Sequence, residues 1–163
     1  MTLKELEKRL QALEDIEEIK QLHYKYIYAL NSRNFDEIID MFAEDMTEDG
    51  FPRGETHKGI KEITKVWRNI EEGGRGKLRH TTIVAQPVIT VEGDMAKGYW
   101  LWLGRLADRR VFKSTEEADD DTIMQVLPKL GRYDMEYKKV DGKWKISYLK
   151  FTLPWPKNQY VNK

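Results

Sequence analysis

The stretch TTIVAQPVITVEGDMAKGYWLWLGRL, residues 81–106, decides the fold class of this chain. Its first part, Thr81 to Val91, is rich in Thr, Val and Ile, which favour extended backbone. The turn sequence Glu92-Gly93-Asp94 follows, and the β pattern resumes from Ala96 to Leu106. Two such runs around a short turn predict an antiparallel hairpin.

The C-terminal part of the chain repeats this arrangement. Residues 133–140 and 143–153 predict a second hairpin around Asp141-Gly142. Between the hairpins, residues 108–128 are highly charged, which is typical of a surface insertion. Residues 154–163 open with Pro-Trp-Pro and are expected to form a tail.

The N-terminal part has helical periodicity. Residues 3–30 contain neither Gly nor Pro, and apolar residues recur in steps of three and four, which predicts one long helix or two abutting ones. Asn34 can cap a second helix from Phe35 to Phe42. A turn-rich stretch, Glu48 to Gly54, precedes a third helix that starts after Gly59.

The first fourteen residues differ from the rest of the first helix. Leucines at positions 3, 6, 10 and 13 have coiled-coil spacing, but about two heptads are too few to predict a coiled coil. We expect residues 1–14 to form a helical arm that packs on the body or on a sister subunit.

Length and element order together indicate one domain. A chain of 163 residues is close to the size of a single domain. Helices come first and antiparallel strands follow, which predicts an α+β domain over residues 1–163, with the helices over the concave face of a curved sheet.

Composition excludes several classes of function. Lys plus Arg and Asp plus Glu both total 28, so there is no net charge to attract nucleic acid or an acidic membrane. The chain has no Cys and three His, which excludes a Cys/His zinc site; we expect no metal and no cofactor. The charged N-terminus is unlike a signal peptide and no segment has the length of a membrane span, so a cytoplasmic location is expected.

Short motifs spread over most of the chain resemble the SnoaL-like polyketide cyclase and dehydratase family of the nuclear transport factor 2-like superfamily. They are Asp15–Lys20, Lys25-Tyr26, Ala29–Asn31, Phe42–Asp45, His57–Ile60, Arg79-His80, Val91–Gly98 and Lys139–Ile146. The resemblance implies a cone-shaped α+β barrel with one pocket. Members such as scytalone dehydratase and the bile-acid dehydratases use a pocket His with a nearby Asp and Tyr.

The resemblance assigns roles to three residues of this chain. His80 matches the family His and would act as the base, or it would be a strand-start histidine bonded to a neighbour. Tyr26 matches a family Tyr and would hydrogen-bond a developing oxyanion, or it would only pack in the core. Asn31 stands where many relatives have Asp; it would orient His80 or a substrate oxygen, or cap the helix. Gly104 lies where some dehydratases carry a second acid.

Aromatic residues are candidates for the walls of the pocket, or for plain core. Trp100 and Trp102 share one face of their strand because side chains alternate, and Trp67 follows a helical stripe. The substrate-binding candidates are Trp67, Trp100, Trp102, Tyr148 and Phe51. For His23, within the first helix, a structural or exposed role is expected.

Two hypotheses for function follow. The first is a cofactor-free lyase or isomerase acting on a hydrophobic cyclic or aromatic carbonyl compound, and a carboxylate from Asp134 or Glu136 reaching His80 would favour it. The second is a non-catalytic binding or assembly module on the same fold. A homodimer is expected in either case, formed through Tyr99, Leu101 and Leu103.

Overall fold

The computed structural model describes residues 1–50, 54–72, 81–105, 129–153 and 155. His80, Phe51 and the expected insertion at 108–128 therefore lie outside the described residues, as does almost all of the expected tail at 154–163. The described chain contains three helices and six strands, in the order α1 (Leu3–Ser32), α2 (Phe35–Asp40), β1 (Phe42–Asp49), β2 (Thr56–Lys58), α3 (Ile60–Glu72), β3 (Thr81–Glu92), β4 (Met95–Arg105), β5 (Lys129–Val140) and β6 (Lys143–Thr152).

The first helix is continuous, which selects one long helix over the two abutting helices that the pattern also allowed. Thr2 caps it: the Thr2 hydroxyl accepts from the Glu5 amide at 3.2 Å, and the Glu5 carboxylate accepts from the Thr2 amide at 2.7 Å. The helix ends where Arg33 adopts a left-handed conformation. Asn34 then caps α2 by accepting from the Glu37 amide, which confirms that predicted cap.

All six strands form one sheet, in the order β2-β1-β6-β5-β4-β3. The four strands from β3 to β6 pair antiparallel as two consecutive hairpins, which confirms the predicted meander. β1 pairs parallel with β6, so the complete sheet is mixed. Within the described residues β2 and β3 are its two edges, so the sheet is curved but not closed into a barrel.

Strand β1 was not predicted. The sequence indicated a helix up to Phe42 and turns from Glu48 onward, whereas residues 42–49 are extended. The alternation is hard to recognise because Glu44 and Asp45 are both exposed, and because a third acid, Glu48, takes a buried position where an apolar residue is expected.

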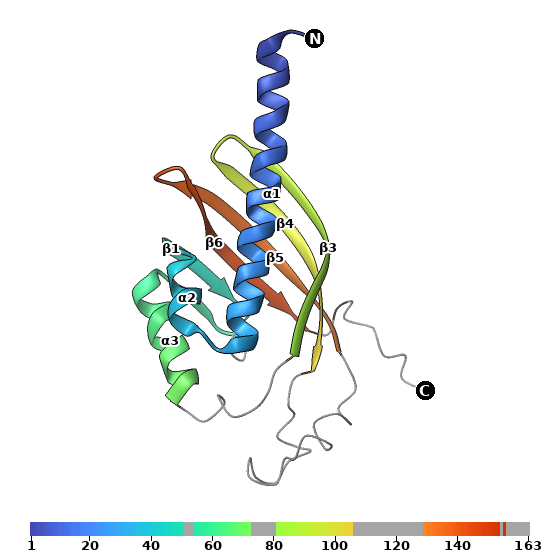
Figure 1. The fold of residues 1–163 in the computed structure, drawn as a ribbon. Coiled ribbons are helices and arrows are strands. Elements are labelled where there is room, and N and C mark those ends of the chain that lie inside the picture. Colours follow the sequence, from blue (N-terminus) through green and yellow to red (C-terminus); the bar gives the residue numbers. More distant parts are fainter. Residues whose placement is uncertain (51–53, 73–80, 106–128, 154, 156–163) are drawn as a thin grey trace.

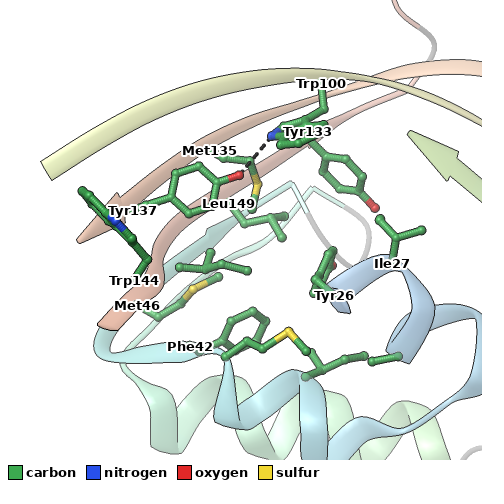
Figure 2. Packing of buried hydrophobic residues seen from close by; sticks show 14 of the residues in the cluster. Tyr26, Ile27, Phe42, Met46, Trp100, Tyr133, Met135, Tyr137, Trp144 and Leu149 are labelled. Carbon is green, nitrogen blue, oxygen red and sulfur yellow. Dashed lines mark hydrogen bonds between the residues drawn. The ribbon is translucent and has the colours of Figure 1, made fainter. Parts of the chain in front are cut away.

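The core lies between the sheet and the helices. α1 crosses one face of the sheet, and α2 and α3 lie near β1 (Figure 1). Alternate residues of β5, namely Tyr133, Met135 and Tyr137, are buried, as are Trp100 and Trp102 of β4. Trp100, Tyr133 and Tyr137 contact His23 of α1. Figure 2 shows this aromatic-rich packing between sheet and helices. The α+β class with N-terminal helices covering a curved sheet is thus confirmed.

Candidate functional site

Strand β1 places an acidic side chain in the core. Met46 and Glu48 are two residues apart and both face inward, because alternate side chains of a strand point to the same side. Glu48 is only 1% exposed, and its strand is held in register by the pairing of Glu48 with Leu149 on β6. A carboxyl group so deeply buried marks a candidate functional site.

The surroundings of Glu48 keep its carboxyl group protonated. Burial raises the pKa of Glu48 to about 8, because a carboxylate would lose its hydration, and a hydrogen bond with the Trp67 side chain opposes this rise. One oxygen, Oε2, has no hydrogen-bond partner among the described residues. Glu48 can therefore donate or accept a proton at neutral pH.

Two tyrosines complete this group. Burial raises the pKa of Tyr26 well above 10, and the neighbouring Tyr133 and Glu48 add to the effect. Burial likewise raises the pKa of Tyr133. The hydrogen bond with Tyr26 lowers this pKa, and the nearby Glu48 raises it. Tyr133 extends from β5 with its hydroxyl toward Tyr26 and Ile27 of α1 (Figure 2). We call Glu48, Tyr26, Tyr133 and Trp67 the acid cluster.

A second polar group, the His23 triad, adjoins the acid cluster. It consists of His23, Tyr137 and Trp100. The Trp100 indole donates to the Tyr137 hydroxyl at 3.0 Å, drawn as the dashed line in Figure 2, and that hydroxyl lies 3.2 Å from Nδ1 of His23. The His23 ring lies 5.7 Å from the rings of both Tyr26 and Tyr133, between centroids.

The hydrogen bonds of the triad indicate which nitrogen of His23 carries the proton. Trp100 can only donate, so the Tyr137 oxygen accepts from it, and the Tyr137 hydroxyl proton is then available for Nδ1. This assigns the proton of His23 to Nε2. Nε2 has no partner among the described residues, although the residue is fully buried. Burial lowers the pKa of His23 to about 3, so the ring is neutral and offers one N–H.

The candidates identified from the sequence lie in different places. Tyr26 and Trp67 belong to the acid cluster, and Trp100 belongs to the His23 triad. Trp102 is buried on the same face of β4 but packs edge-on against Phe151, away from the polar groups. Tyr148 is half-buried, and its hydroxyl donates to Asp49 at 3.2 Å.

Asn31 connects α1 to the edge of the sheet. Its Nδ2 donates to the Thr82 carbonyl at 2.8 Å, and its Oδ1 accepts from the Thr82 amide at 2.9 Å. The side chain thus takes the place of a neighbouring strand at the start of β3. It is not the helix cap, because Arg33 occupies that position.

The two carboxylates of β5 that were named as possible partners of His80 point away from the core. Asp134 and Glu136 alternate with the buried residues of that strand, and they pair with Arg132 and Lys97 respectively. The buried carboxyl comes instead from Glu48, which sequence reasoning missed together with His23, Tyr133 and Tyr137. The spacing of Met46 and Glu48 was the available signal, since a period of two indicates a strand.

Among the described residues no three His, Asp or Glu gather as metal ligands.

The chain resembles several solved structures in fold. An NTF2-like protein with a cystatin-like fold from Novosphingobium aromaticivorans matches with a TM-score of 0.71 at 17% identity, over 96% of this chain and 93% of that one. A protein named provisionally as a scytalone dehydratase, from the same organism, matches with a TM-score of 0.64 at 20% identity, over 85% and 83%. The association domain of CaMKII from C. elegans matches with a TM-score of 0.63 at 14% identity, over 87% and 98%.

These likenesses establish an NTF2-like fold, and at such low identity they establish only the fold. The sequence identifies the family as well as the fold, because the family model of the SnoaL-like domain matches residues 11–150. The chain belongs to the SnoaL-like domain family. In the part of the chain that the structure describes, no helix is both long and apolar enough to cross a membrane.

Proposed function

We propose that the chain is a cofactor-independent lyase or isomerase of the dehydratase type. The observation that carries this proposal is the buried Glu48, which lies beside Tyr26 and Tyr133 and has one carboxyl oxygen without a hydrogen-bond partner among the described residues. A group whose pKa lies close to neutrality is suited to proton transfer. The family relationship and the dehydratase-named neighbour agree with this class of reaction.

The proposed substrate is a neutral, hydrophobic cyclic or aromatic carbonyl compound. The acid cluster and the His23 triad contain no group that is charged at neutral pH, because Glu48 is mostly protonated and His23 is neutral. A charged ligand would therefore lose its hydration without gaining a counter-ion. A carbonyl oxygen, by contrast, can accept hydrogen bonds from these groups.

Proton transfers account for the proposed elimination. His80, the base that the family resemblance implies, takes a proton from the carbon next to the carbonyl. Tyr26 donates a hydrogen bond to the oxygen that gains negative charge. Glu48 gives its proton to the departing hydroxyl, which leaves as water, and the proton held by His80 then returns to Glu48. Without a leaving hydroxyl, the same groups would move a double bond.

The test is the loss of water from a β-hydroxytetralone, which becomes a fluorescent naphthol. We expect Glu48→Gln to lower kcat by at least ~100-fold, as removal of a general acid does. Glu44→Gln is the matched control, because Glu44 is exposed on the same strand. His80→Ala should also abolish turnover, and Tyr26→Phe should cost less. Turnover that survives both Glu48→Gln and His80→Ala would refute the proposal.

A second candidate function is a non-catalytic binding or assembly module. It is favoured by the fold likeness to an association domain and by an apolar outer surface on β3 and β4. There Tyr99 is 48% exposed and Leu103 is 43% exposed, and each faces an exposed residue of β3, Val88 and Ile83. We propose that two copies meet through this surface. If sedimentation shows that a Leu103→Glu variant associates as strongly as the parent, this proposed contact is contradicted.

A further inference from the structure

Helix α1 carries two apolar stripes on different sides. The residues of its second half that are buried against the sheet include Ile19, His23 and Tyr26. The leucines of the first half, at positions 3, 6, 10 and 13, do not continue that stripe. At ~100° per residue, the centres of the two stripes lie about 160° apart around the helix axis. A straight helix cannot place both stripes on one body.

The leucine stripe is uncovered. Leu3 is 72% exposed, Leu6 48%, Leu10 54% and Leu13 64%. The first half of α1 projects beyond the sheet in Figure 1. The expectation that the arm packs on its own body is therefore not met, because every residue from Met1 to Gln11 is exposed.

A buried carboxylate fixes the rotation of the arm. Asp15 accepts from the Trp144 indole at 3.1 Å and lies 2.6 Å from the Lys139 ammonium group. Both partners come from the second hairpin, on the side of α1 that faces the sheet. These contacts hold the leucines on the side away from the body, and the cap at Thr2 keeps the arm helical from its start.

The arm's charges match a second arm in parallel orientation. With Leu3 and Leu10 at heptad position a, Leu6 and Leu13 fall at d, Arg9 at g and Glu14 at e. In a parallel pair a g residue meets the e residue five positions later on the partner. Arg9 would thus face Glu14 of the second copy, twice per pair. In an antiparallel pair the acidic e residues, Glu7 and Glu14, would face each other.

We propose that the leucine stripe of α1 pairs in parallel with the same stripe of a second copy of this chain. Two heptads are too short to be stable alone, so the pairing adds to whatever contact the bodies make. It does not depend on the proposed catalytic function.

Cysteine cross-linking tests the geometry, because the chain contains no native Cys. In the parallel register position 6 meets position 6 across the seam, within reach of a disulfide. We expect Leu6→Cys to give a disulfide-linked dimer under mild oxidation, at least ~10-fold more than Lys8→Cys, which lies on the opposite side of the arm. Equal yields from the two variants would overturn the proposal.

Charge exchange provides a second test. Arg9→Glu and Glu14→Arg should each weaken self-association by roughly tenfold, because each places like charges opposite one another. Mixing the two variants should give heterodimers in excess over random pairing, as seen by native mass spectrometry. Lys8→Glu is the matched control and should change nothing. Random pairing in the mixture, or binding of the arm to phosphatidylglycerol vesicles in place of self-association, would refute arm pairing.

Discussion

The imidazole of His23 lies flat against the indole of Trp100, with 4.0 Å between ring centroids and 8° between ring planes. The stacking removes one face of the imidazole from any contact with water. Together with full burial it keeps the ring neutral, since an imidazolium ion at this place would lose its hydration. His23 therefore acts as a packed aromatic ring that carries one hydrogen-bond donor.

Acid should destabilise the protein through His23. Burial lowers the pKa of His23 to about 3, from an ordinary value of 6.5, so the unfolded chain binds this proton more readily than the folded one. The stability that the neutral ring contributes is present above pH 6.5 and is lost as pH falls toward 3. Urea unfolding from pH 7 to pH 4 should show this decline, and it should be shallower in His23→Gln.

Glu48 should have the opposite pH dependence. Its pKa is raised from 4.5 to about 8, so the folded state binds this proton more tightly than the unfolded chain. The contribution is complete below pH 4.5 and is lost as pH rises through 8. We expect Glu48→Gln to be more stable than the parent at pH 9 and similar to it at pH 4, by urea unfolding. Equal stabilities at pH 9 would contradict the raised pKa.

Loss of the Tyr137 hydroxyl should be costly. Tyr137→Phe removes the oxygen that accepts from Trp100 and the group that bonds Nδ1 of His23, so two buried polar atoms lose their partner. The expected loss of stability is about 1–3 kcal/mol. Tyr99→Phe, on the exposed face of the neighbouring strand, is the control and should be neutral within error. Chemical denaturation measures both.

Replacing Asn31 by Asp tests the departure from the family. Asp keeps the acceptor for the Thr82 amide but loses the donor and places a carboxylate against the Thr82 carbonyl. We expect a loss of about 1 kcal/mol in stability. If the site is a dormant dehydratase, the same change should raise turnover of the β-hydroxytetralone. Neither effect is expected for Asn69→Asp, an exposed change in α3.

Sequence patterns predicted the main elements because their periodicities are strong. The long α1, the cap at Asn34 and the two hairpins around Gly93 and Gly142 follow from local signals. Local signals could not predict the parallel pairing of β1 with β6, since it joins residues that lie far apart in the sequence.

The candidate site was predicted only in part for a related reason. Tyr26, Trp67 and Trp100 were recognised because large aromatic residues at apolar positions are expected inside. Glu48 and His23 are polar, and polar residues are usually exposed, so their residue types did not predict that either side chain is buried. Both side chains are buried because the helices and the sheet pack together around them.

The parallel pairing of β1 with β6 also orders the events of synthesis and folding. Phe42 pairs with Ile146 and Glu48 with Leu149, so the strand that carries the acid has no partner on that side until residues 146–149 have been synthesised. The α1 helix and the first hairpin can form earlier, from contacts close in sequence. Enclosure of the carboxyl group therefore has to wait for β6, and until that strand is synthesised Glu48 of the nascent chain lies in water and is ionised.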